Sequence, residues 1–179
     1  MLKITIPGME AYDAERNEFV TVGDKTITLE HSLVSISKWE SKWHKAFISN
    51  DKKTPEETLD YIRCMTITQN VDPEVYLRIP EDVLKQITDY IDDPMTATTF
   101  SDKGSRRSRE IITSEIIYYW MIALNIDPKF ETWHLNRLLT LIRVCSIKSQ
   151  KPKKMNRRDQ INQQRALNAA RRSALHSSG

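Results

Sequence analysis

The sequence predicts a mainly α-helical protein: a helical bundle with a small N-terminal β-hairpin or short sheet and a basic C-terminal helical arm. Residues 1–30 contain short runs in which apolar and polar side chains alternate, as in half-buried strands. From 31 to 147, apolar residues recur every three or four positions, which is the helical period. Beyond residue 147 the chain becomes polar and basic. We therefore expect an N-terminal β element (1–30), a helical core domain (31–147) and a basic linker and arm (148–179).

The β element is predicted by short alternating runs. Residues 2–6 alternate and stop at a Pro-Gly pair, which is a strong turn signal. Residues 18–22 and 25–29 alternate on either side of Gly23 and Asp24, which predicts a hairpin that turns at these two residues. An isolated hairpin is marginal in water, so this one should pack against the helices.

The core helices follow in order. A first helix is expected from about Glu30 to near residues 49–51, because its apolar residues form one stripe. A second begins at Thr54, where the sequence TPEE has the form of a capping box with proline in the first turn. Asp72-Pro73 and Pro80-Glu81 predict two further starts. The first stripe consists of Leu33, Ile36, Trp39, Trp43 and Phe47.

The most hydrophobic stretch runs from Ile111 to Ile126. Its apolar residues cover most sides of a helix, which predicts a central and buried element. Asp127-Pro128 should end this helix and cap the last core helix, in which Leu135, Leu138 and Ile142 share one face.

Charge is distributed unevenly along the chain. The net charge is +3, but residues 148–179 carry nine basic residues and one acid, and residues 1–147 carry 18 basic and 23 acidic residues. The arm is therefore +8 and the body −5. Clustered Lys and Arg suit phosphate backbones, but the arm has no aromatic residue on which bases could stack. Nucleic acid is thus a possible but not a favoured partner, and an acidic protein surface or no partner at all fits as well. The basic residues of interest in the arm are Lys151, Lys153, Lys154, Arg157, Arg158, Arg165, Arg171 and Arg172.

No arrangement of residues in the sequence points to catalysis. The four His and two Cys do not have metal-ligand spacing, and the four Gly form no phosphate-binding loop. We expect no enzyme activity, cofactor or metal. No apolar run is long enough to cross a bilayer, and the N-terminus lacks the pattern of a secretory signal, so we expect no membrane partner.

The tryptophans are the candidates for binding a partner protein. At helical spacing they are read as core residues, and the alternative is an aromatic groove between helices that holds an amphipathic helix of another chain. The candidate residues for this groove are Trp39, Trp43, Phe47, Trp133, Arg137 and Arg143.

Four stretches carry a resemblance to known proteins. They are residues 35–47 (SISKWESKWHKAF), 113–125 (TSEIIYYWMIALN), 133–144 (WHLNRLLTLIRV) and 165–172 (RALNAARR). They resemble a group of tailed-phage proteins encoded in the tail-morphogenesis region, which is similar to the tail assembly chaperones of long-tailed phages. The resemblance extends from about Leu29 to the end of the chain.

The resemblance implies a non-enzymatic morphogenesis factor in the host cytoplasm. It would bind helical segments of the tape measure protein before the tail tube polymerises around that protein. Short chaperones of this kind are often acidic throughout, and the basic arm departs from that pattern. Two alternatives stay open: a structural virion or connector protein that self-assembles through the arm, and a small nucleic-acid-binding packaging factor.

Overall fold

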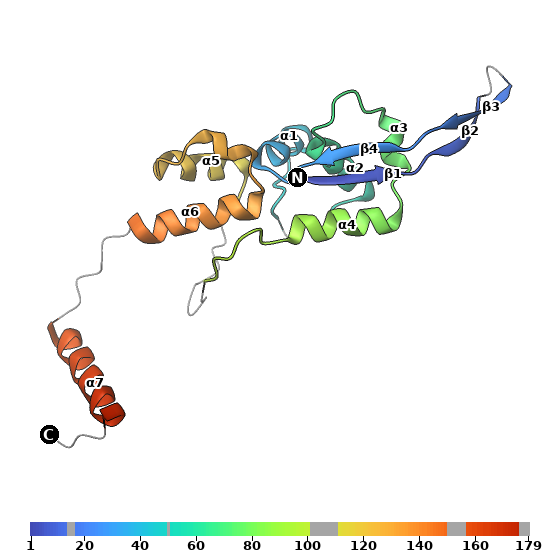
Figure 1. Ribbon diagram of the computed structural model, residues 1–179. Helices are drawn as coiled ribbons and strands as arrows, with labels where there is room; N and C mark the ends of the chain where they lie inside the picture. The colour runs from blue at the N-terminus through green and yellow to red at the C-terminus, as the bar shows by residue number, and fades with distance from the viewer. Residues whose placement is uncertain (14–16, 50, 101–110, 150–156, 176–179) are drawn as a thin grey trace. The chain divides into compact units, whose positions relative to one another are not determined.

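The computed structural model describes residues 1–13, 17–49, 51–100, 111–149 and 157–175 (Figure 1). The chain forms two compact units, Met1–Ile147 and Lys148–Gly179. The described residues are mainly helical and include a small antiparallel sheet near the N-terminus, which confirms the predicted fold class. The strands belong to the same compact unit as the core helices.

The four strands form one long two-stranded ribbon in two sections. β1 (Leu2–Ile6) pairs antiparallel with β4 (Lys25–Leu29), and β2 (Met9–Asp13) pairs antiparallel with β3 (Glu18–Val22). The β1/β4 section lies against the helices, and the β2/β3 section extends past them (Figure 1).

The predicted position of the hairpin turn is wrong. Gly23 and Asp24 lie in the middle of one side of the ribbon, opposite Pro7 and Gly8, and the Gly8 N–H donates to Asp24 Oδ1 at 2.7 Å. Neither Gly23 nor Asp24 has the positive φ that a two-residue hairpin turn requires. The chain reverses between β2 and β3, and there Asn17 has a φ of 54°.

Six helices and one short 3₁₀ helix are described after the ribbon in the first unit. α2 begins as predicted, because the Thr54 side chain accepts from the Glu57 N–H and the Glu57 side chain accepts from the Thr54 N–H. Asp72 caps α3, because its side chain accepts a hydrogen bond from the Glu74 N–H. The elements are α1 (Leu33–Trp43), α2 (Pro55–Met65), α3 (Pro73–Leu77), α4 (Glu81–Asp92), α5 (Ser114–Ala123), η1 (Pro128–Thr132) and α6 (Leu135–Ser149).

The first helix is shorter than its apolar stripe predicted. α1 ends at Trp43, because His44 adopts a left-handed conformation with a φ of 52° and its N–H closes onto the Glu40 carbonyl. Phe47 therefore lies outside the helix and still packs against the core from the following turn.

One continuous core joins the ribbon to the helices. On β1 and β4 the side chains of Ile4, Ile6, Ile27 and Leu29 are buried at alternate positions, as the period of a strand requires. Against them lie buried residues of the helices. These are Leu33, Ile36 and Trp39 of α1, Ile62 and Met65 of α2, Ile87 of α4, Ile117 and Met121 of α5, and Leu138 of α6.

The prediction that the most hydrophobic stretch forms a central buried helix is wrong. Ile117 and Met121 of α5 are buried, but Tyr119 and Ile122 are mainly exposed, Ile122 at 75%. The main contacts of α5 are with α1 and η1, and part of its apolar surface remains uncovered in this unit.

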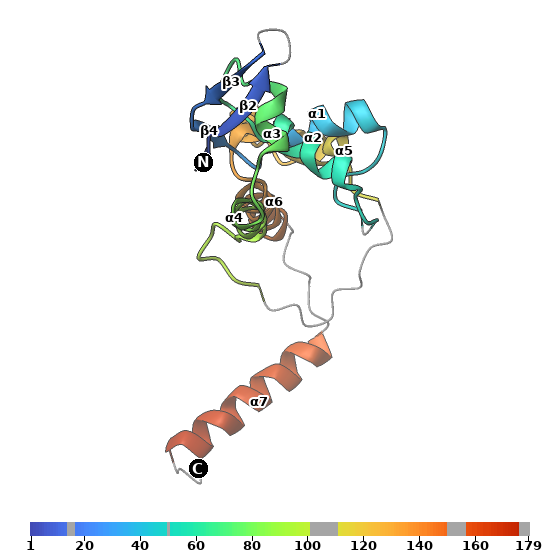
Figure 2. The same cartoon turned by 90° about the vertical axis from the view of Figure 1, so that its right-hand side faces the viewer.

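α4 and α6 lie roughly end to end, as Figures 1 and 2 both show. The His134 Nε2, just before α6, lies 2.9 Å from the Tyr90 carbonyl near the end of α4. The Asn136 side chain donates to the Ile91 and Asp93 carbonyls. The C-terminal carbonyls of α4 thus find partners at the start of α6, which joins the two helices.

The second unit contains α7 (Arg157–Leu175), so the predicted arm is helical. All of its described side chains are exposed, including those of Arg158, Arg165, Arg171 and Arg172. The side chain of Arg157 and the whole of Lys151, Lys153 and Lys154 lie outside the described residues.

Candidate partner-binding grooves

Three rings of the predicted aromatic stripe pack into one cluster, in which Trp39 is buried and the other two are half-buried. Trp39 is only 1% exposed, and its Nε1–H donates to the Glu57 carbonyl at 2.9 Å. Trp43 stacks on Trp39 with ring centroids 6.2 Å apart, and the Phe47 ring meets Trp39 edge-on at 5.2 Å. Trp39 is therefore a core residue, as its helical spacing predicted. Trp43 and Phe47 are half-buried beside it.

Polar contacts hold this aromatic cluster between α1 and α2. The Asp60 carboxylate accepts from Lys42 Nζ at 2.5 Å and from Trp43 Nε1 at 2.8 Å. The buried Glu57 carboxylate accepts from Lys45 Nζ at 2.5 Å. These contacts fix the orientation of α1 on α2, so the cluster stabilises the fold.

Trp133 and Arg137 form a separate surface pair. The Arg137 guanidinium lies 4.0 Å from the centroid of the Trp133 ring, and the Phe130 ring lies 4.3 Å from the same ring. Trp133 is half-buried and Arg137 is exposed. The pair remains available at the start of α6, but it is not joined to the Trp39 cluster.

An apolar groove of about 380 Å³ lies between α5 and α6. One wall is formed by Trp120, Ala123 and Leu124. The other wall is formed by Leu139, Ile142, Arg143, Ser146 and Ile147 of α6. Ile147 is 52% exposed, so the groove exposes apolar surface to solvent. Here it is called the α5/α6 groove.

Glu40 holds the α5 wall of this groove in place. Its carboxylate is 8% exposed and accepts from the Phe47 N–H at 2.7 Å and from the Ser114 N–H at 2.8 Å. Ser114 is the first residue of α5, so its N–H has no partner within the helix. One carboxylate of α1 therefore fixes both the turn after α1 and the beginning of α5.

One basic residue, Arg143, lines the α5/α6 groove, and its guanidinium lies 4.1 Å from the centroid of the Phe100 ring. Of the six residues that the sequence analysis selected as partner-binding candidates, Arg143 is the one that lines this groove.

A second apolar groove, of about 420 Å³, lies between α2, α3 and α4. Here it is called the α2–α4 groove. Leu77 at its edge is 71% exposed. The lining residues are Lys53, Pro55, Thr58, Leu59, Ile62, Tyr76, Leu77, Ile79 and Leu84.

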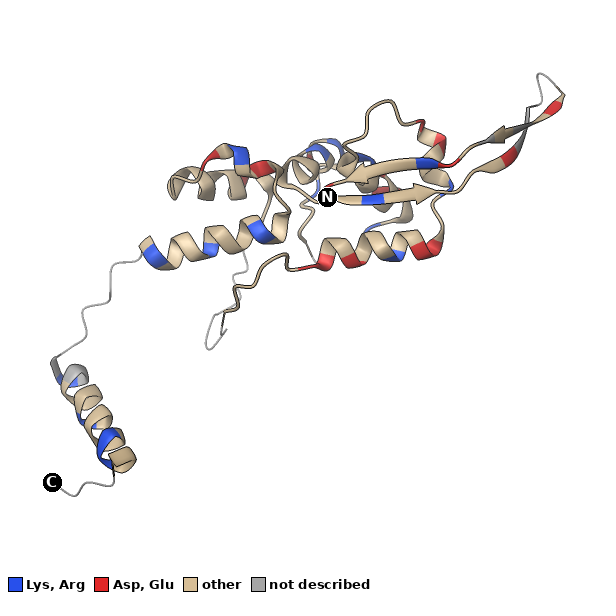
Figure 3. Ribbon diagram, viewed as in Figure 1, with Lys and Arg blue, Asp and Glu red and all other residues tan. Residues whose placement is uncertain are grey.

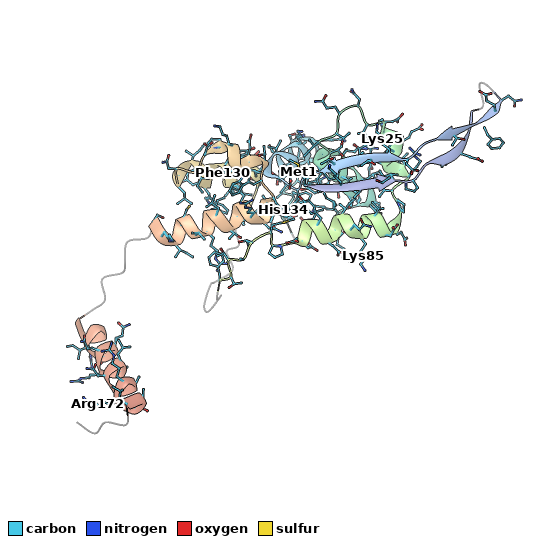
Figure 4. All side chains as sticks on the ribbon, viewed as in Figure 1. Met1, Lys25, Lys85, Phe130, His134 and Arg172 are labelled. Atoms are coloured by element: carbon cyan, nitrogen blue, oxygen red, sulfur yellow. The ribbon has the colours of Figure 1, made fainter. Side chains whose placement is uncertain are left out.

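Two buried histidines, His31 and His134, lie side by side. His134 lies between the end of α4 and the start of α6 (Figure 4). The rings of His31 and His134 are 5.0 Å apart, and His31 Nδ1 lies 2.5 Å from the Tyr61 hydroxyl. Burial, and then the neighbouring His134, lower the pKa of His31 to about 3. The Tyr90 hydroxyl next to His134 donates to the buried Glu30 carboxylate at 2.7 Å. Apart from His134 Nδ1, which has no hydrogen-bond partner among the described residues, these groups bond to one another inside the core, as in a structural polar network.

The described residues contain no group of three or more His, Cys, Asp or Glu side chains placed to hold a metal ion. Within the same residues, none of the helices combines the length and the apolar character needed to cross a bilayer. Cys64 and Cys145 are free thiols, both half-buried, and burial raises the pKa of Cys64.

Neither groove was predicted from the sequence. The signal for the α5/α6 groove was the apolar surplus of 111–126, which predicted deep burial although an exposed apolar wall produces the same pattern. Comparisons of the chain with protein-family models, with curated proteins and with solved structures found no match.

Proposed function

We propose that this protein is a non-enzymatic tail morphogenesis factor, similar to tail assembly chaperones, that holds helical segments of the tape measure protein in the α5/α6 groove. The observation that carries the proposal is the uncovered apolar wall between α5 and α6. Apolar patches that remain exposed on a folded unit are typical of sites that bind another protein. The resemblance to tail assembly chaperones supplies the identity of the client.

The shape and lining of the α5/α6 groove favour an amphipathic helix as the bound segment. An apolar groove between two helices suits a third helix, whose anchors recur at i, i+3 or i+4, and i+7. The client segment should therefore carry an apolar stripe with this spacing.

Co-expression with the tape measure protein tests this proposal. The client should be soluble and should co-purify with the wild-type protein. Ile147→Glu, which places a charge in the α5/α6 groove, should abolish co-purification. Ile67→Glu is the matched control, because Ile67 is 48% exposed against 52% for Ile147 and does not line the groove. The control should retain the client.

Two outcomes would overturn the proposal. If the client is equally soluble and unbound without this protein, the chaperone function is wrong. If Ile147→Glu and Ile67→Glu retain the client equally, the α5/α6 groove is not the binding site. Analysis of purified particles separates a chaperone, which should be absent from them, from a structural virion protein.

A further inference from the structure

We propose that α7 of one copy docks into the α2–α4 groove of a second copy, so that the protein self-associates through its arm. The proposal concerns a different groove from the client site and does not depend on the proposed function. The first unit offers a groove with an acidic border, and the second offers an exposed basic helix that carries a few large apolar side chains.

The two long walls of the α2–α4 groove carry the same pair of residue types. Leu59 of α2 lines the groove three residues after Glu56, and Leu84 of α4 lines it three residues after Glu81. Residues three apart are neighbours on a helix surface, and both glutamates are exposed. Each leucine of the groove therefore has a carboxylate beside it at the border.

The outer surface of α4 extends this negative border. Figure 3 shows acidic residues at both ends of the helix. Asp82, Asp89 and Asp92 are exposed, and Lys85 is the single basic residue within α4. Lys53 lines the groove as well, but its Nζ donates to the Phe47 carbonyl at 2.7 Å and lies 4.3 Å from the centroid of the Phe47 ring. The charge of Lys53 is thus engaged within its own unit.

α7 carries the complementary pairs. Ile161 precedes Arg165 by four residues, and Leu167 precedes Arg171 by four residues, so each large apolar side chain has an arginine one helical turn away. These side chains are exposed. A helix this polar and this exposed gains little stability from its own unit, so docking an apolar face would add stability that it otherwise lacks.

Apolar residues of α7 would enter the groove while its arginines face the border glutamates. Both requirements of a specific contact are then met: an apolar centre and complementary charge at the border. The contact joins two different surfaces of the chain, so it is of the head-to-tail kind and can continue from copy to copy.

Sedimentation velocity of the nuclease-treated full chain tests the association. We expect the average mass to rise above 20.9 kDa with concentration and to fall back as salt increases from 0.05 to 0.5 M. The arm variant Arg165→Glu/Arg171→Glu and the groove variant Glu56→Lys/Glu81→Lys should each weaken association about tenfold or more. Lys129→Glu and Glu18→Lys, which change charge outside both surfaces, should have little effect.

Mixing the two charge-reversed variants is the decisive measurement. Each is expected to remain monomeric alone, and an equimolar mixture should associate, because the reversed arm of one now matches the reversed groove of the other. A monomeric wild-type protein at all concentrations would overturn the proposal. A mixture that stays monomeric would also overturn it, and would indicate that any docking occurs within one chain.

A second pair of variants separates the groove from unspecific charge attraction. Leu167→Gln removes an apolar anchor and leaves the charge unchanged, so it should weaken association. Ser173→Gln lies about 120° around the helix from both Leu167 and Ile161 and should have no effect. Equal effects of the two substitutions would exclude insertion of this face of α7 into the groove.

Discussion

Replacing Glu40 by alanine should destabilise the first unit and loosen the start of α5. The substitution removes a buried acceptor that the Phe47 and Ser114 N–H groups share. A hydrogen bond to a charged group contributes roughly 1.5–3 kcal/mol, so the loss of both predicts a decrease of about 3–6 kcal/mol in the free energy of unfolding. Because a typical domain is stable by roughly 5–15 kcal/mol, this is a large fraction of the total.

Urea unfolding followed by tryptophan fluorescence measures this decrease. All four tryptophans lie in residues 1–147, so the signal reports on the first unit alone. Glu40→Gln retains one acceptor oxygen and should lose about half as much as Glu40→Ala. Glu10→Ala removes an exposed carboxylate and should stay within about 0.5 kcal/mol of the wild type. If Glu40→Ala loses less than about 1 kcal/mol, Glu40 does not hold α5 as argued.

Two further predictions concern stability. Lowering the pH from 7 to 5 should cost about 2 kcal/mol through His31, because the unfolded chain binds a proton near pH 6.5 that the folded protein binds only near its pKa of about 3. His31→Gln should therefore show a flatter dependence in urea unfolding between pH 5 and 7, and parallel curves would contradict the assignment. Thr54→Ala should lower the free energy of unfolding by about 1 kcal/mol through loss of the α2 cap, and Thr54→Ser should retain most of it. Equal losses for the two Thr54 variants in the same assay would show that the cap does not contribute.

Local signals in the sequence predicted the fold class and several helix starts well. The capping box at Thr54 and the proline at position 55 mark the start of α2 because their chemistry acts within four residues. The end of α1 was missed, because the left-handed residue there is a histidine and not the glycine or asparagine usual at that position.

Pairing between strands was harder to predict than the strands themselves. The Gly23-Asp24 pair has the composition of a hairpin turn, but the chain places it opposite Pro7-Gly8, where both sides of the ribbon interrupt their pairing together. Which strand pairs with which depends on contacts across the ribbon, and no short segment contains that information.

The candidate site could be predicted only in part, because hydrophobicity does not distinguish a buried face from an exposed binding face. Trp39 and Ile122 both occur in apolar helical stripes, yet the first is interior and the second is at the surface. The difference arises from how many neighbours each helix has, which is a property of the assembled unit.

The two-part ribbon has a practical consequence for experiments on assembly. Its outer section, β2 and β3, extends past the helices, and both grooves are lined almost entirely by helical residues. A fluorophore attached to the outer section would therefore travel with the folded unit without occupying either proposed binding surface. Labelled and unlabelled copies could then be followed as they exchange, which would give the lifetime of an assembled state and not only its size.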